Sequence, residues 1–295
     1  MAEVRMRGER RDGDGQGDHG HGDHGRGDHG PEGLRVDLPR LLGRRRMLGL
    51  VGGGAALALL AARGGAQAVT GTAADGARCV AMPAETAGPF PADGTNVRAG
   101  QVVNILTEAG VIREDIRPSI GGLRPVAAGV PMRLELRLVD VRRGCAPLAG
   151  RAVYLWQCDA EGVYSLYGAT DRNYLRGVAI SDAEGRVRMV TVVPGTYPGR
   201  WPHFHFEVFA DAAAAVGGAG ALLTSQFALP EEVCRAAYAA EGIYRDSVPA
   251  LDRLTLAGDM IFRNGTAAEK AAQMLRVAVD ARAGFLATGE VGLAL

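Results

Sequence analysis

Residues 132–141 read MRLELRLVDV, a stretch in which apolar and polar side chains alternate. This period of two is typical of a β-strand with one buried and one exposed face, because successive side chains point to opposite faces. Residues 203–209, HFHFEVF, repeat the alternation, and residues 152–158, AVYLWQC, are rich in β-branched and aromatic side chains. All three stretches therefore predict strands.

Turn sequences separate the predicted strands at short intervals. They occupy residues 159–162, 182–185 and 194–195. Helical periodicity is scarce and is confined to roughly residues 229–241 and 266–275. Short strands with frequent turns favour two packed sheets over alternating strands and helices. The sequence predicts an all-β fold: a two-sheet β-sandwich core with a loop-rich periphery and few short helices.

The composition excludes some classes of function. The 295-residue chain carries 33 basic and 33 acidic side chains, so its formal net charge is zero. A nucleic-acid-binding surface usually needs a basic excess, and we therefore expect no nucleic-acid partner. A hydrophobic fraction of 47% supports a globular domain with one sizeable core.

The first 68 residues differ from the rest of the chain. Residues 1–43 are rich in Gly, Asp and His and hold too little apolar surface to fold, so we expect a disordered tail. Residues 44–68 begin with three consecutive arginines, followed by a short apolar run and a small-residue site, which is the pattern of a twin-arginine-type export signal. The apolar run is shorter than the ~20 residues of a membrane span. We expect residues 69–295 to be an exported domain, periplasmic or extracellular, with no stable membrane span.

This domain contains four cysteines: Cys79, Cys145, Cys158 and Cys234. In an oxidising compartment an even number of cysteines allows up to two disulfides, and four cysteines allow three pairings. The sequence does not choose among these pairings. No C-x-x-C pair is present, which argues against a zinc cluster or a redox motif.

Beyond the tail the chain has only two histidines, His203 and His205. Positions i and i+2 of a strand face the same side, so both imidazoles can reach one metal ion. Glu207 continues that face and leaves a two-histidine, one-carboxylate Fe(II) site open. Tyr164 and Tyr197 lie in loops upstream, and an ionised phenol is a hard anionic ligand suited to a trivalent cation. Spacing alone does not choose between these ligand sets.

An ordered series of motifs resembles the intradiol ring-cleavage dioxygenases. Residues 153–165 (VYLWQCDAEGVYS) and 175–206 resemble the family signature, with its successive Tyr, Tyr, Arg and H-x-H positions. Residues 85–90 (ETAGPF) are similar to the family's T-x-G-P-aromatic loop, and residues 113–117 (REDIR) match the segment that follows it. The likeness covers most of residues 79–230 and is closest to exported, single-domain members of the family.

The resemblance implies a non-haem Fe(III) centre that inserts both atoms of O2 into a catechol, between its hydroxyl-bearing carbons, to give a muconate-type diacid. The residues that match the family's metal ligands are Tyr164, Tyr197, His203 and His205. Tyr197 matches the ligand that leaves when the catechol chelates the iron, and Arg200 matches the arginine that stabilises the electron-rich ring. Gln226 resembles a glutamine of the substrate pocket. Trp201 is expected to narrow the pocket mouth or to stack on an aromatic ring.

The sequence departs from the family pattern at positions that affect the predicted substrate more than the predicted metal site. Only five residues separate Tyr197 from His203, fewer than in the well-known catechol enzymes, so we expect a different pocket lid. The partners expected are a small aromatic diol and O2, and an oligomer is allowed. Two other hypotheses stay open: an inactive sandwich that binds aromatics or polysaccharide, and a copper or zinc protein built on the H-x-H pair.

Overall fold

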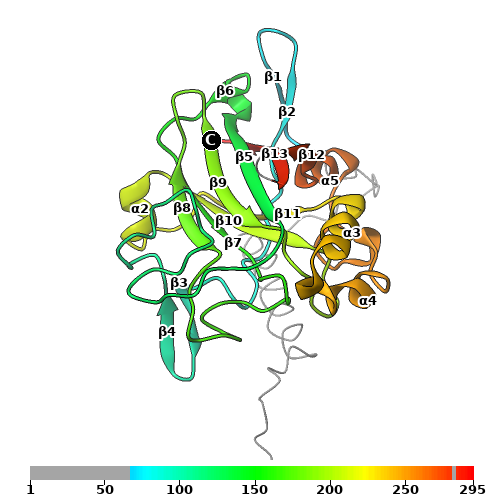
Figure 1. Ribbon diagram of the computed structural model, residues 1–295. Coiled ribbons are helices and arrows are strands. Elements are labelled where there is room, and N and C mark those ends of the chain that lie inside the picture. The colour runs from blue at the N-terminus through cyan, green and yellow to red at the C-terminus, as the bar shows by residue number, and fades with distance from the viewer. Residues whose placement is uncertain (1–66, 281–283) are drawn as a thin grey trace, which may run out of the picture.

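The computed structural model describes residues 67–280 and 284–295. The predicted tail over residues 1–43 lies outside these ranges, as does the predicted export signal except for its last two residues. Two sheets and two small hairpins form most of the described fold, with the helices gathered mainly at one end (Figure 1).

The first sheet has four antiparallel strands in the order β11-β10-β7-β8. In that order their bounds are Leu223–Ala228, His203–Phe209, Ala152–Trp156 and Arg176–Ile180. In the second sheet β13 lies between β12 and β5, and β5 also pairs with β9 and with the short β6. These strands are β12 (Arg276–Asp280), β13 (Gly284–Leu293), β5 (Pro131–Asp140), β9 (Arg186–Val192) and β6 (Ala146–Pro147). The hairpins are β1 (Thr70–Thr72) with β2 (Arg78–Val80), and β3 (Asp93–Arg98) with β4 (Gln101–Asn104).

The main hydrophobic core lies between the two sheets. The alternation of β5 buries Leu134 and Leu136, and the alternation of β10 buries Phe204 and Phe206, all in one cluster of contacts. Phe206 also stacks on Phe227 of β11, with ring centroids 4.8 Å apart. Each such side chain contributes roughly 1.5–3 kcal/mol when it leaves water. The prediction of an all-β, two-sheet sandwich is confirmed.

A second cluster covers the opposite face of the four-stranded sheet. Tyr154 and Trp156 of β7 belong to it, whereas their neighbours Val153 and Leu155 belong to the main core. Trp156 is the register partner of His205, and the two rings stack 4.9 Å apart at 9°. The histidine face of β10 therefore turns away from the main core and into this second cluster.

Helices are few and short, as predicted. The α-helices are α2 (Ala212–Val216), α3 (Glu231–Ala240), α4 (Ser247–Leu251) and α5 (Ala267–Gln273), and the 3-10 helices are η1 (Val141–Arg143), η2 (Gly242–Tyr244) and η3 (Leu256–Gly258). α3 and α5 lie where the sequence predicts helical periodicity, and α5 begins with a capping box between Thr266 and Glu269. None of the helices in the described ranges is long and apolar enough to cross a membrane.

Of the four cysteines, Cys79 of β2 and Cys145 form a disulfide. Cys158 and Cys234 are buried as free thiols. One of the two disulfides that the sequence allows is therefore present. It joins the β1–β2 hairpin to the turn that follows β5 and η1.

Candidate active site

Two tyrosines and two histidines bring their polar atoms to one point. The Tyr164 hydroxyl lies 3.4 Å from the Tyr197 hydroxyl, 3.4 Å from His203 Nε2 and 3.1 Å from His205 Nε2. The two Nε2 atoms are 3.0 Å apart, and the Tyr197 hydroxyl is 3.2 Å from His203 Nε2. We call these four side chains the tyrosine–histidine cluster. Atoms spaced in this way can each lie about 2 Å from a common ion, the usual length of a metal bond to nitrogen or oxygen.

Each side chain of the cluster is positioned by the element that carries it. β10 presents both histidines because they are two residues apart on one strand face. Tyr164 follows a tight turn in which the Asp159 carboxylate accepts hydrogen bonds from the backbone N–H groups of Glu161 and Val163. The segment before Tyr197 is held by Ser247, whose hydroxyl accepts a hydrogen bond from the N–H of Thr196 at 3.0 Å.

The histidine protonation states suit metal binding. His203 Nδ1 contacts the carbonyl oxygen of Trp201, which can only accept, so Nδ1 carries the proton and Nε2 presents a lone pair to the cluster. Burial, together with the charge of Arg200, lowers the pKa of His203 to about 3. Burial and the neighbouring His203 also hold the pKa of His205 well below its usual value. Both imidazoles are therefore neutral, the form in which histidine binds a metal.

The tyrosine hydroxyls need a cation before they ionise. Burial raises the pKa of Tyr197 to about 12, and burial with the nearby Tyr197 raises that of Tyr164 well above its usual value. A bound metal ion favours the phenolate and opposes this shift. The donor set, two neutral nitrogens and two hard oxygens that ionise only beside a positive charge, fits a trivalent cation such as Fe(III).

The two-histidine, one-carboxylate alternative does not fit the geometry. Glu207 is buried on the histidine face, but its carboxylate accepts a hydrogen bond from Thr224 at 3.0 Å. The described part of the chain contains no group of three or more His, Cys, Asp or Glu side chains that could hold a metal ion. Glu207 therefore does not complete a site with His203 and His205.

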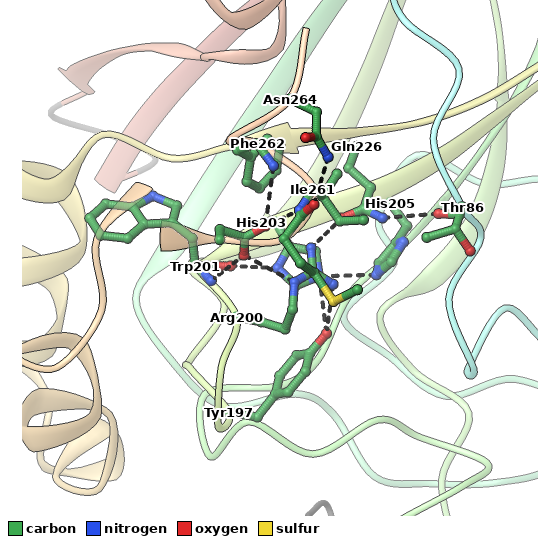
Figure 2. A network of polar contacts seen from close by, with 12 residues as sticks. Thr86, Tyr197, Arg200, Trp201, His203, His205, Gln226, Ile261, Phe262 and Asn264 are labelled. Carbon is green, nitrogen blue, oxygen red and sulfur yellow. Dashed lines mark hydrogen bonds and ion pairs between the residues drawn. The ribbon is translucent and has the colours of Figure 1, made fainter. Parts of the chain in front are cut away.

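Arg200 links the cluster to two further segments. Its Nη1 lies 3.5 Å from the Tyr197 hydroxyl, and its Nη2 donates to the Gln226 side-chain oxygen at 2.6 Å. Its Nε donates to Asp259 at 3.0 Å in an ion pair whose side chains are only 5% and 1% exposed. Figure 2 shows these contacts meeting beside His203 and His205. Arg200 and Gln226, two residues that the sequence predicts at the site, thus lie beside the cluster.

Trp201 does not lie where the sequence predicts it. Its backbone N–H donates to Asp259 at 2.8 Å, and its indole N–H donates to the carbonyl oxygen of Leu229 at 2.8 Å. The ring is 4% exposed, belongs to the main core and points away from the cluster (Figure 2). The prediction that Trp201 narrows the pocket mouth is therefore wrong: its side chain packs the core, and its carbonyl orients His203.

The segment over residues 86–90 covers the cluster from the other side. The carbonyl oxygen of Thr86 accepts a hydrogen bond from the Gln226 amide at 2.9 Å. Gly88 has a φ of +72°, and a Cβ there would lie 3.2 Å from His205 Cε1. Phe90 places its ring 4.9 Å from that of Tyr164. The glycine of the T-x-G-P motif is thus required by both backbone conformation and space.

Sequence reasoning missed two buried charged residues beside the cluster. Asp259 follows η3, far from every predicted motif. Arg176 is fully buried on β8, where it donates to the carbonyl oxygens of Pro91 and Ser165. Arg176 lies within residues 175–206, which resemble the family, but a single arginine at the start of a strand does not by itself indicate a structural role. Its side chain holds the segment before β3 against the loop that carries Tyr164.

Comparison with known proteins gives matches over part of the chain. Residues 123–216 match a family model described as dioxygenase. This segment is therefore similar to dioxygenases. The protocatechuate 3,4-dioxygenase beta chain of Burkholderia cepacia is 37% identical over an alignment of 88 residues, and the match covers 25% of this chain and 37% of that protein. The chain thus spans little more than a third of the length of this dioxygenase relative.

A solved dioxygenase structure has the same fold. The intradiol ring-cleavage dioxygenase from Tetranychus urticae superposes with a TM-score of 0.53 at 21% identity, covering 73% of this chain and 94% of that one. At this identity the likeness concerns the fold. Together with the family match, it confirms the resemblance to intradiol ring-cleavage dioxygenases that the motifs indicate.

Proposed function

We propose that the protein is a non-haem Fe(III) intradiol dioxygenase whose iron ligands are Tyr164, Tyr197, His203 and His205. The observation that carries the proposal is the convergence of two neutral imidazole nitrogens and two phenol oxygens at spacings of 3.0–3.4 Å. Two ionised phenols supply negative charge that favours ferric over ferrous iron. The activities named for the relatives support the same reaction class.

The reaction proposed is cleavage of a catechol-type ring between its two hydroxyl-bearing carbons. Both atoms of O2 enter the product, a muconate-type diacid, so no reductant is needed. Bound iron would supply a Lewis-acidic centre that holds both substrate oxygens. Proton transfer and the stabilisation of charge on the substrate would come from side chains of the protein.

Tyr197 is the ligand suited to exchange with the substrate. It is half-buried, whereas Tyr164 is 1% exposed. With iron held by the four side chains, the Tyr197 oxygen would be the group placed to take the proton of one substrate hydroxyl. Arg200 keeps its positive charge 3.5 Å from that oxygen, where it favours negative charge on the bound ring. His203 keeps its orientation through the Trp201 carbonyl.

We also propose that the domain over residues 69–295 works outside the cytoplasm. The twin-arginine-type signal over residues 44–68 supports this, because that route carries folded proteins. The Cys79–Cys145 disulfide gives independent support, because such bonds persist in oxidising compartments. Cell fractionation tests this proposal: we expect the mature domain outside the cytoplasm. A variant with the arginines at positions 44–46 replaced by Lys is the export-deficient control.

The function is tested by loading the purified domain with iron. We expect red protein, from charge transfer between tyrosinate and Fe(III), with one iron per chain. It should consume O2 with at least one member of a panel containing catechol, protocatechuate and hydroxyquinol, with a muconate-type product in mass spectrometry. The control variant is Tyr238→Phe, which alters a buried tyrosine that bonds the Pro194 carbonyl outside the cluster.

Three outcomes separate the hypotheses. Iron-replete but colourless protein contradicts the ligand assignment. Red protein that binds catechols tightly without O2 uptake supports the inactive binding module instead. Preferential retention of copper or zinc after growth in mixed metals supports the H-x-H metal protein.

A further inference from the structure

Asp259 is the most extensively bonded carboxylate near the cluster. One oxygen accepts hydrogen bonds from Arg200 Nε at 3.0 Å and from the Trp201 backbone N–H at 2.8 Å. The other accepts from the N–H groups of Ile261 at 2.8 Å and Phe262 at 3.2 Å. Asp259 is 2% exposed, so these four donors replace water almost completely.

The partners of Arg200 leave one edge of its guanidinium directed at the cluster. Nε is held by Asp259 and Nη2 by Gln226, whose own amide is held by the Thr86 carbonyl. Nη1 remains, and it faces the Tyr197 hydroxyl at 3.5 Å. An unrestrained arginine side chain has about 2 kcal/mol of rotamer entropy, so this orientation requires fixed partners.

Asp259 also fixes one wall of the site. Its bonds to the backbone of residues 261 and 262 shape the turn after η3, and the Phe262 ring lies 6.4 Å from the His203 ring, edge to face. Figure 2 shows Phe262 and Ile261 on the side of the cluster opposite Tyr197. The segment that follows η3 is therefore in contact with the cluster.

We propose that Asp259 is a positioning residue that aims Arg200 Nη1 at the Tyr197 oxygen, the place that a substrate oxygen takes during turnover. This inference rests on the proposed function for its consequence in catalysis, but the orientation itself does not depend on iron. Asp259 touches no reacting atom and acts through Arg200. Without it, Gln226 is, among the described residues, the remaining side chain outside the cluster that accepts a hydrogen bond from the guanidinium.

A positioning role differs measurably from a purely structural one. A buried ion pair often adds little to net stability, yet removal of one partner leaves the other charge uncompensated. Asp259→Asn keeps the shape and the acceptor for the turn, but places an NH2 group against the donors of Arg200. If Asp259 acts through Arg200, the two residues are energetically coupled and their substitutions are not additive.

The experiment compares Asp259→Asn, Arg200→Met and the double variant, each iron-loaded. Asp252→Asn is the matched control, since this aspartate pairs with Arg235 at 2.8 Å on the surface. We expect Asp259→Asn to lower kcat roughly 10- to 100-fold and to change KM less than about threefold. The double variant should match Arg200→Met within about twofold. Additive losses, or a wild-type kcat in Asp259→Asn, would overturn the proposal.

A second measurement needs no turnover. In the iron-free, 15N-labelled protein, the Arg200 side-chain resonances are assigned by their absence in Arg200→Met. We expect separate, slowly exchanging Nη signals in the wild type and in Asp252→Asn, and averaged signals in Asp259→Asn. Unaveraged signals in Asp259→Asn overturn the proposal even if activity falls. Averaged signals with no activity in any protein, wild type included, support the positioning role and contradict the proposed reaction.

Should Asp259→Asn not fold, Asp259→Glu is measured in the same way. It keeps the charge but moves the carboxylate by one methylene, so kcat and the Nη signals should again change together. A folded Asp259→Glu with wild-type kcat and wild-type signals overturns the requirement for this exact geometry.

Discussion

The two tyrosines of the cluster differ in their surroundings although both hydroxyls face the same point. Tyr164 is packed against Phe90 and is almost fully buried. Tyr197 is half-buried and lies beside Arg200. Burial with the Tyr197 charge nearby disfavours an unpaired phenolate at Tyr164, so this oxygen depends most on the metal ion. Their substitutions should therefore have different effects.

We expect Tyr164→Phe to lose most of the visible charge-transfer band and to bind iron at least tenfold more weakly than the wild type. Tyr197→Phe should keep a red-shifted band from Tyr164 alone, bind iron, and lower kcat more than KM, because the proton acceptor for the substrate is gone. Visible spectra and iron analysis of both variants check this. Equal spectra for the two variants would mean that the ligands are assigned to the wrong roles.

A second residue-scale effect concerns pH. Burial raises the pKa of Glu85 to about 7, against the opposing effects of a hydrogen bond from Gln273 and the charge of Arg200. Asp259 and Glu269 add to the rise. The folded state thus holds this proton more tightly than the unfolded chain, so the contribution of Glu85 to stability is fully present below the usual carboxyl pKa and is lost as pH rises through about 7.

Replacing Glu85 with Gln should remove this pH dependence. When the pH is raised from 4.5 to 8, the unfolding free energy of the wild type should fall, and this fall should exceed that of Glu85→Gln by up to about 3 kcal/mol. Urea titrations at four pH values measure the difference, with Glu241→Gln on the surface as the control. Parallel pH profiles for wild type and Glu85→Gln would contradict the burial argument.

At the scale of elements, the strands were predictable and the contacts between loops were not. The period of two gives β5 and β10, and the spacing of His203 and His205 places both on one face. The two tyrosines that we propose as ligands could be selected only through the family resemblance, because loop residues have no periodicity. Asp259 lies 59 residues from Arg200 along the chain, and no local pattern connects them. Trp201 was misplaced because adjacency to Arg200 does not reveal which way the next side chain turns.

Arg176 also makes contacts that no local sequence pattern predicts, and its contribution to stability can be tested. This buried arginine bonds the carbonyl oxygens of Pro91 and Ser165 and so joins β8 to two loops. Arg176→Met removes the arginine donor from the Ser165 carbonyl and leaves the Pro91 carbonyl with the Tyr154 hydroxyl alone, which should cost about 3 kcal/mol of unfolding free energy. Arg188→Met, at an exposed ion pair with Asp182, should cost less than about 1 kcal/mol. Denaturant titration compares them; similar losses would contradict a special role for Arg176.

At the scale of the whole molecule, the sandwich and the disulfide stabilise different parts. The main core joins the two sheets, whereas the Cys79–Cys145 bond ties the N-terminal hairpin to the end of β5. The two buried free thiols lie apart from this bond, in the main and the second clusters. The sequence could not select this pairing, because it depends on the path of the chain across both sheets.

Because the disulfide closes a loop of 66 residues, it should contribute about 4 kcal/mol by restricting the unfolded chain. We expect Cys79→Ser with Cys145→Ser to lose roughly this amount, while Cys158→Ala keeps the disulfide and loses only packing. Calorimetry or urea titration under non-reducing conditions measures both. Thiol titration should find no reactive group in the native wild type and two after unfolding, since Cys158 and Cys234 are buried. A count of none after unfolding would mean that the second pair had also formed a bond, against the geometry of the folded domain.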